Sequence, residues 1–327
     1  MKCFHPITID LSGTDAYFHY KSPLIKVPCG KCAACIKNKR NEWVFRLSKM
    51  QECASTSYFV TLTYDDEHLV RTDNDMFLNP TLVPEHVEDF MHKLINKGQS
   101  IWTNEQKVTG MPYKERRKNR LKIKYFLVGE YGDKYDRPHY HFIIFDFPGD
   151  RELITRCCQD LWQKQSTIVD VRYASGALIN YLTKYMIKDT DVDYESMRVH
   201  PPFRRMSKGL GLNHVSLANA KRYFSRDKFV DKIGNAYYGL PRYMKEKMEK
   251  LYFKHLHGVW DDDKEFYYSL HALRYERSQF ITEKVNDRKR FPQFYDVDIM
   301  SDELKEQQLQ LHNKVIKELK TTNKLQL

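Results

Sequence analysis

The most restrictive feature of this chain is a pair of strand-like runs, residues 123–131 and 139–147, separated by the turn-rich sequence GDKYDRP. Both runs are rich in aromatic and β-branched residues, and Gly, Asp and Pro lie between them, which is the pattern of paired antiparallel strands. Further strand-like runs cover residues 56–66 and 167–175. We therefore expect a mainly antiparallel sheet built around this hairpin.

Segments with helical periodicity alternate with these strands. Apolar residues recur at helical spacing in residues 36–55, 150–164 and 176–189. Residues 83–98 begin with Pro and acidic residues and close on Gly98, which are ordinary start and stop signals of a helix. The order of the elements indicates an α+β fold, with the sheet flanked by helices.

The chain is basic, with 54 Lys and Arg against 43 Asp and Glu among 327 residues. The net charge of +11 favours a polyanionic partner, most simply nucleic acid. The sequence has no G-x-x-x-x-G-K-[ST] motif, so nothing indicates an ATP-driven motor. It also has no apolar leader and no run of about 18 apolar residues. We therefore expect an intracellular protein with reduced thiols and no membrane partner.

His139 and His141 are two residues apart in a predicted strand, so their side chains leave the same face of the sheet. Glu130 lies at the end of the preceding strand, where hairpin pairing could place its carboxylate beside the two imidazoles. Such a partial shell suits Mg²⁺ or Mn²⁺ when the substrate supplies oxygen ligands, and zinc is the alternative. The simpler interpretation is an accidental pair, like His255 and His257, which face apart on a predicted helix.

Tyr181 and Tyr185 are four residues apart on a predicted helix and therefore share a face. Lys184 is their cationic neighbour, and a cation favours the phenolate form that a tyrosine nucleophile needs. The alternative is a pair of core aromatics, since the chain has 22 tyrosines. A metal with open positions and a tyrosine nucleophile together fit phosphodiester transesterification through a covalent phosphotyrosine.

Three motifs resemble those of the HUH endonucleases of the rolling-circle replication initiator class, and they occur in the order of that family. They are FVTLTY at 59–64, HYH at 139–141 with Glu130 upstream, and YLTKY at 181–185. The segments MKCFHPI, VPCGKCAACIKNKRNEWVFRL, FVTLTYDDEHL and LPRYMKEK are similar to replication initiation proteins of Microviridae, most of all the gokushoviruses. Tyr140 departs from the apolar residue that the family prefers between the histidines, and we expect its ring to pack on the far face.

This resemblance implies an HUH endonuclease-like fold and site-specific nicking and rejoining of single-stranded DNA at an origin, which starts phage rolling-circle replication. It assigns catalysis to Tyr181, Tyr185 and Lys184, and a Mg²⁺ or Mn²⁺ ion to Glu130, His139 and His141. The implied partners are the origin in single-stranded and replicative-form circular DNA, a host helicase and the replication polymerase. The implied location is the cytoplasm of a host bacterium.

Four regions follow from the pattern and the resemblance. They are a Cys-rich segment with a basic helix at 1–55, a nuclease core at 56–195, a basic loop and helix packed on the core at 196–260, and a helical C-terminal extension at 261–327.

Cysteines gather near the start of the chain. Cys29, Cys32 and Cys35 have the spacing C-x-x-C-x-x-C, which is typical of zinc sites, and Cys3 or His5 offers a fourth ligand. The alternatives to a structural zinc site are an iron–sulfur site and a thiol that is merely part of the core. The other cysteines are expected to be buried thiols, namely Cys53, Cys157 and Cys158.

Two basic segments, predicted as loops, could contact DNA phosphates. Their candidate residues are Arg116, Arg117, Lys118, Arg120, Arg204, Arg205 and Lys208. The alternative is that both segments are simply solvated.

Two rival functions remain open at this point. A mobile-element transposase would use the same chemistry on a paired hairpin-end substrate. A zinc-stabilised nucleic-acid-binding module would bind DNA without forming a covalent adduct, and its histidine and tyrosine pairs would be core residues.

Overall fold

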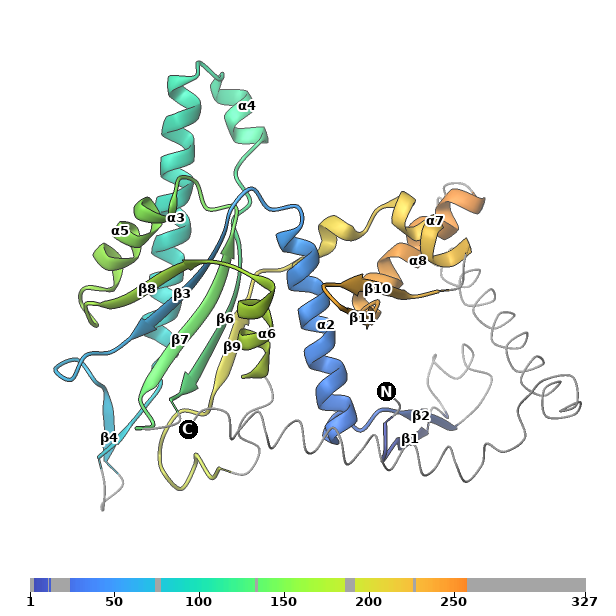
Figure 1. Ribbon diagram of the computed structural model, residues 1–327, viewed down its shortest axis with the longest axis horizontal. Helices are drawn as coiled ribbons and strands as arrows, with labels where there is room; N and C mark the ends of the chain where they lie inside the picture. The colour runs from blue at the N-terminus through green and yellow to red at the C-terminus, as the bar shows by residue number, and fades with distance from the viewer. Residues whose placement is uncertain are drawn as a thin grey trace, which may run out of the picture. The chain divides into compact units, whose positions relative to one another are not determined.

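Figure 1 shows the computed structural model, which describes residues 3–10, 12, 24–73, 78–132, 135–185, 192–225 and 228–257. The predicted C-terminal extension at 261–327 lies outside these residues. The chain divides into two compact units, the first comprising Met1–Lys39, Ser216–Phe229 and Lys245–Leu327, and the second Arg40–Val215 and Val230–Met244. None of the described helices combines the length and apolar character needed to cross a membrane.

The second unit is built on a five-stranded antiparallel sheet with the strand order β8-β3-β7-β6-β9. Its strands are β3 (Ser57–Thr63), β6 (Lys124–Tyr131), β7 (Pro138–Phe145), β8 (Ile168–Tyr173) and β9 (Phe203–Met206). The predicted hairpin is confirmed, since β6 and β7 pair from Lys124 opposite Phe145 to Tyr131 opposite Pro138.

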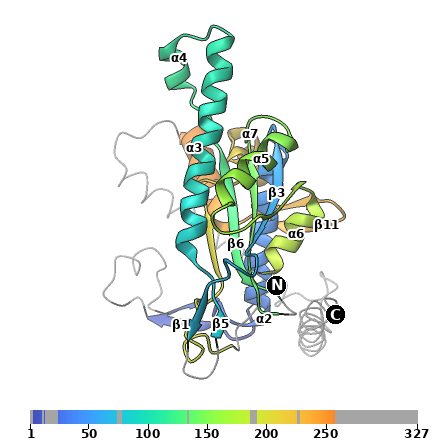
Figure 2. The same ribbon diagram turned by 90° about the vertical axis from the view of Figure 1, so that its left-hand side faces the viewer.

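Helices cover both faces of this sheet (Figures 1 and 2), which confirms the α+β prediction. On one face, α3 (Pro84–Val108) and α5 (Arg151–Trp162) bury residues such as Phe90 and Trp162 against the sheet. On the other face, α6 (Gly176–Lys184) and the part of α2 (Ala33–Gln51) from Arg40 onward bury Leu47, Ile179 and Leu182.

The strand β9 corrects one prediction, because its residues were expected to form a loop. Arg205 and Arg204 pair with Leu127 and Val128 of β6, so the strand is held by an antiparallel ladder at the edge of the sheet. Its own sequence is too short and polar to show the period-two pattern of a half-buried strand. Tertiary pairing therefore decides its structure.

The helix α3 is longer than predicted, because Gly98 does not end it. A Cβ atom at Gly98 would lie 2.7 Å from Cδ1 of Ile123 and 2.8 Å from a ring carbon of Phe147. Glycine is needed here for close packing and not as a helix cap. The helix continues to Val108.

Several shorter elements complete the described structure. In the second unit they are β4 (Arg71–Asp73), β5 (Leu78–Pro80), α4 (Tyr113–Lys118), a 3₁₀ helix (Leu212–His214), β10 (Val230–Ile233) and β11 (Ala236–Gly239). The first unit contains β1 (Ile7–Asp10), β2 (Leu24–Val27) and α7 (Leu217–Ser225), and α8 (Arg242–His257) begins in the second unit and continues into the first. The helix α4 was predicted as loop. It buries no residue, so apolar periodicity could not reveal it.

Candidate active site

The sheet places the predicted metal-binding side chains on one face. Glu130 of β6 lies directly opposite His139 of β7, and His141 is two residues further along the same strand. On the other side of β7, Thr63 pairs with His139 and Thr61 pairs with His141. Because alternate strand residues share a face, all five side chains leave the sheet on the same side.

Hydrogen bonds fix both imidazoles. Nε2 of His141 lies 3.0 Å from Oε1 of Glu130, and both residues are buried, with exposed fractions of 6% and 4%. Nδ1 of His141 lies 3.0 Å from Oγ1 of Thr61, and Nδ1 of His139 lies 2.8 Å from Oγ1 of Thr63. A histidine that binds an ion through Nε2 carries its proton on Nδ1 and donates it to an outer partner, which these two threonines provide.

The threonines were not identified as site residues from the sequence. Thr61 and Thr63 occur at alternate positions of FVTLTY, which was interpreted only as a structural strand. Period-two threonines in a strand adjacent to paired histidines could have identified them, because cross-strand neighbours on one face interact.

The tyrosines reach this site from α6. The side chain of Ser175 caps the helix by accepting a hydrogen bond from the backbone N–H of Leu178 at 3.3 Å. The ring centroids of Tyr181 and Tyr185 are 4.9 Å apart. The ring of His141 stacks on that of Tyr185 at 5.5 Å between centroids and meets that of Tyr181 edge-on at 5.8 Å.

The two tyrosines differ in exposure. Tyr185 is buried, with 7% of its surface exposed, whereas Tyr181 is only half-buried. The buried ring of Phe59 stacks on His141 at 5.8 Å and contacts Tyr181 at 6.1 Å. Lys184 is half-buried and lies one helical turn after Tyr181, so its side chain starts from the neighbouring helix position.

Comparison with known proteins addresses the identity of the chain. Residues 57–190, which span β3 through the tyrosine segment, match the family described as Replication-associated protein ORF2. The replication-associated protein ORF2 of Spiroplasma virus 4 is 32% identical over 242 residues, covering 68% of this chain and 68% of that relative. The chain belongs to this replication-associated protein family.

Two further members of the replication-associated protein family come from phages of other hosts. VP4 of Bdellovibrio phage phiMH2K is 27% identical over 220 residues, covering 59% of this chain and 62% of the relative. ORF4 of Chlamydia phage 1 is 25% identical over 264 residues, covering 75% of this chain and 58% of the relative. No solved structure shows a significant match.

This replication-associated protein also has a cysteine cluster, which lies in the first unit. Sγ of Cys3 is 3.4 Å from Sγ of Cys29 and 3.8 Å from Sγ of Cys32, and Sγ of Cys29 is 4.0 Å from Sγ of Cys35. All four sulfurs lie within 4.8 Å of one another. A tetrahedral zinc ion with Zn–S bonds of about 2.3 Å requires S···S edges of about 3.8 Å, so the cluster could bind Zn²⁺.

The ligand set of this cluster is therefore four cysteines. Cys3 occupies the fourth position, and His5 is exposed and does not belong to the group. Burial raises the pKa of Cys32, but hydrogen bonds from backbone N–H groups, including those of Phe4 and Cys35, outweigh it and lower that pKa to about 6. Burial raises the pKa of Cys35 to about 12, so zinc would displace its proton.

The remaining cysteines are placed as predicted with one exception. Cys157 and Cys158 are buried, but Cys53 is exposed, so the prediction for Cys53 was wrong. It follows the last residue of α2, where the chain turns toward β3, and its side chain therefore faces solvent instead of the core.

Zinc binding can be tested by removing one ligand. We expect Cys32→Ser to reduce bound zinc from one ion per chain to nearly none and to lower the melting temperature, because structural zinc contributes directly to folding. Elemental analysis and thermal unfolding measure both effects. The exposed Cys53 offers a matched control, and Cys53→Ser should change neither. Iron instead of zinc in the purified protein would contradict the assignment.

The predicted DNA-contacting residues have different surroundings. Arg204 pairs with Val128 on the edge of the sheet, in the same row as His141. Arg205 points to the opposite face, where its Nε lies 2.5 Å from Oε1 of Glu88 on α3. Lys208 is exposed, and its carbonyl accepts a hydrogen bond from Lys124. The other four, Arg116, Arg117, Lys118 and Arg120, lie in or just after α4.

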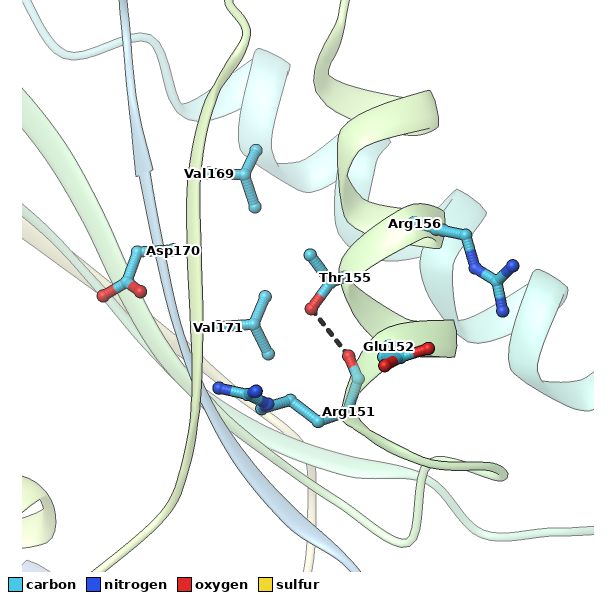
Figure 3. A pocket seen from close by; sticks show the side chains of 7 residues that line it. All are labelled: Arg151, Glu152, Thr155, Arg156, Val169, Asp170 and Val171. Carbon is cyan, nitrogen blue, oxygen red and sulfur yellow. Dashed lines mark hydrogen bonds between the residues drawn. The ribbon is translucent and has the colours of Figure 1, made fainter.

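A separate cavity of about 420 Å³ lies between α5 and β8 (Figure 3). It is lined by Arg151, Glu152, Thr155, Arg156, Val169, Asp170 and Val171. In Figure 3, Val169 and Val171 point toward α5 while Asp170 points away. Asp170 shares a row with Thr61 and His141, so the cavity lies behind the sheet with respect to the histidines. It is therefore distinct from the candidate active site.

Proposed function

We propose that this replication-associated protein is an HUH-type nickase and ligase that cuts single-stranded DNA at a phage origin and starts rolling-circle replication. The observation that supports this most directly is the position of His141. Its imidazole contacts the carboxylate of Glu130 on one side and the rings of both Tyr181 and Tyr185 on the other. An accidental strand histidine would have no reason to join a buried carboxylate to two tyrosines from a distant helix.

The donor set fits a divalent metal ion. Glu130, His139 and His141 supply one carboxylate and two imidazoles on one face, and threonine hydroxyls hold the Nδ1 side of each ring. A metal ion bound by Glu130 and His141 would replace their mutual hydrogen bond. When bound, Mg²⁺ or Mn²⁺ would polarise a non-bridging oxygen of the scissile phosphate.

The tyrosines supply the nucleophile in this proposal. The phenolate oxygen of one tyrosine attacks phosphorus, the bond from phosphorus to the 3′ oxygen breaks, and that oxygen takes a proton to become a free 3′-hydroxyl. Lys184 favours the phenolate by its charge. The new 5′-phosphotyrosyl ester is similar in chemistry to the bond that broke, so attack by a 3′-hydroxyl reseals DNA without ATP.

Two adjacent tyrosines suit repeated rounds of this reaction. One tyrosine would hold the parental 5′ end while the other attacks the regenerated origin, and the free 3′-hydroxyl would prime the host polymerase. Origin DNA in single-stranded and replicative form is the proposed substrate, and strand separation falls to a host helicase.

The proposal is tested by incubating the full chain with circular single-stranded DNA of its source replicon and Mn²⁺, followed by a denaturing gel. We expect a covalent protein–DNA adduct that disappears with a chelator. Tight binding to origin DNA without any adduct would instead support a nucleic-acid-binding module without catalysis.

We further predict that two adjacent arginines differ in their effect on this reaction. Arg204 lies two strands from His141 on the same face, a separation of about 10 Å that a long side chain and a phosphate can bridge. Arg204→Ala should weaken binding of single-stranded origin DNA by about tenfold, whereas Arg205→Ala should change it less than about threefold because Arg205 already pairs with Glu88. Fluorescence anisotropy measures both, and equal losses would refute the distinction.

A further inference from the structure

The basic arm, defined as residues 107–122, stands out because it has almost no role in the core. The buried residues of α3 end at Gly98, and α4 has none. Val108 and Tyr113 are 87% and 69% exposed. Figures 1 and 2 show α3 running past the sheet with α4 near its far end.

The arm is nevertheless ordered by its own contacts. Gly110 adopts a φ of +76°, which glycine tolerates at a tight turn, and its N–H donates to the carbonyl of Lys107 at 3.0 Å. The guanidinium of Arg116 donates to the carbonyl of Met111 and lies 6.0 Å from the ring centroid of Tyr113. Arg116 therefore holds the turn to α4, and the arm has a defined shape without support from the core.

The remaining charges of the arm face solvent. Its sixteen residues contain seven Lys and Arg and one Glu, so they carry +6 of the net charge of +11. Lys114, Arg117, Lys118 and Arg120 are all exposed, and no ion pair found among the described residues involves them. A dense positive charge on an exposed, shaped element is suited to a polyanion.

The position of the arm limits which part of a DNA substrate it can touch. It leads into Lys124, the first residue of β6, whereas Glu130 lies six residues further along that strand. At about 3.4 Å per residue this separation is about 20 Å. Because bases are spaced about 3.4 Å apart in a duplex, DNA that reaches both places spans at least about six base pairs.

The chemistry of the arm favours duplex DNA over a single strand. Platforms for single strands combine basic residues with several aromatic rings on which unpaired bases stack. The arm offers one aromatic ring, Tyr113, against seven basic residues. Duplex DNA presents a negative charge about every 1.7 Å along its axis and rewards positive charge alone.

We propose that the basic arm binds double-stranded DNA at a distance of at least about six base pairs from the phosphate that is cut. This inference rests on the proposed function, because the distance is counted from the nicking site. The contact is sequence-independent and adds affinity for duplex next to a single-stranded origin.

The experiment uses single-stranded origin oligonucleotides that carry duplex flanks of about 0, 4, 8 and 12 base pairs, chosen around the expected spacing. The wild-type protein should gain affinity between the 4 and 8 base-pair flanks. The variant Lys114→Ala/Arg117→Ala/Lys118→Ala/Arg120→Ala should lose about tenfold or more on the longest flank, and its slope of log K against log salt should fall by about 3 to 4. Its binding to the flank-free oligonucleotide should stay within about twofold.

The matched control removes the same charge elsewhere in the same unit. Lys93→Ala/Lys97→Ala/Arg156→Ala/Lys164→Ala changes four exposed residues in or just after α3 and α5. Equal losses in the two variants, or an equal loss on the flank-free oligonucleotide, would overturn the proposal. If the wild type shows the flank dependence but forms no adduct with any substrate, the proposed function fails while duplex binding by the arm stands.

Discussion

Replacing both Tyr181 and Tyr185 with phenylalanine is expected to abolish the covalent adduct and to slow nicking by at least about a thousandfold. The variant lacks both phenol oxygens but keeps both rings. The ring contacts between the two residues and with His141 are thereby preserved. The loss therefore reports chemistry, and circular dichroism and the melting temperature should match those of the wild type.

The single variants should separate the two tyrosines. Tyr181 is half-buried and Tyr185 is almost fully buried, so Tyr181 is more accessible to a scissile phosphate before the site opens. We expect Tyr181→Phe to slow first-strand cleavage more than Tyr185→Phe does. A single-turnover assay with a labelled oligonucleotide measures this difference, and the reverse order would assign first cleavage to Tyr185.

A pair of tyrosines outside the site provides the control. Tyr173 and Tyr237 are exposed, and neither contacts the histidines. Tyr173→Phe/Tyr237→Phe should form the adduct at the wild-type rate. An adduct that persists in the Tyr181→Phe/Tyr185→Phe variant would place the nucleophile elsewhere and remove the central argument for the proposed reaction.

The parts of the fold that the sequence predicted are those with strong local periodicity. The β6–β7 hairpin is one example, because each strand is buried and each is rich in aromatic and β-branched residues. The shared face of Glu130, His139 and His141 follows from the period of two and from the hairpin register. The proximity of Tyr181 and Tyr185 follows from helical spacing in the same way.

The parts that it did not predict depend on contacts between distant segments. Gly98 reads as a helix stop until Ile123 and Phe147 are known to press against it. The strand β9 exists because β6 has an edge to pair with. Thr61 and Thr63 join the site because β3 lies beside β7, and neighbouring strands cannot be paired from the periodicity of each alone.

The ion pair of Arg205 is another example of this limit. In sequence, Arg204 and Arg205 are equivalent basic residues of one segment. In the sheet they face opposite sides, and only Arg205 meets the carboxylate of Glu88. A charge run therefore indicates a class of partner, but the strand period decides which of its members are available to that partner.

Replacing Glu130 with glutamine is expected to slow nicking by about a hundredfold or more and to raise the Mn²⁺ concentration needed for half-maximal rate. Glutamine keeps the shape of the side chain, and its amide oxygen can still accept a hydrogen bond from His141, so the buried packing around it is retained. What is lost is the negative charge that a divalent ion requires. Mn²⁺ titration of the nicking rate, alongside thermal unfolding, separates this effect from a loss of fold.

The second histidine pair supplies the control for this experiment. His255 and His257 have the same spacing as His139 and His141 but lie in α8, where residues two apart point in different directions. His255→Ala/His257→Ala should leave the Mn²⁺ dependence unchanged. If Glu130→Gln also left it unchanged, the carboxylate would serve only to orient His141, and the ion would have to be held without it. The difference between the two variants thus tests whether the strand geometry, and not the mere spacing of two histidines, makes the site.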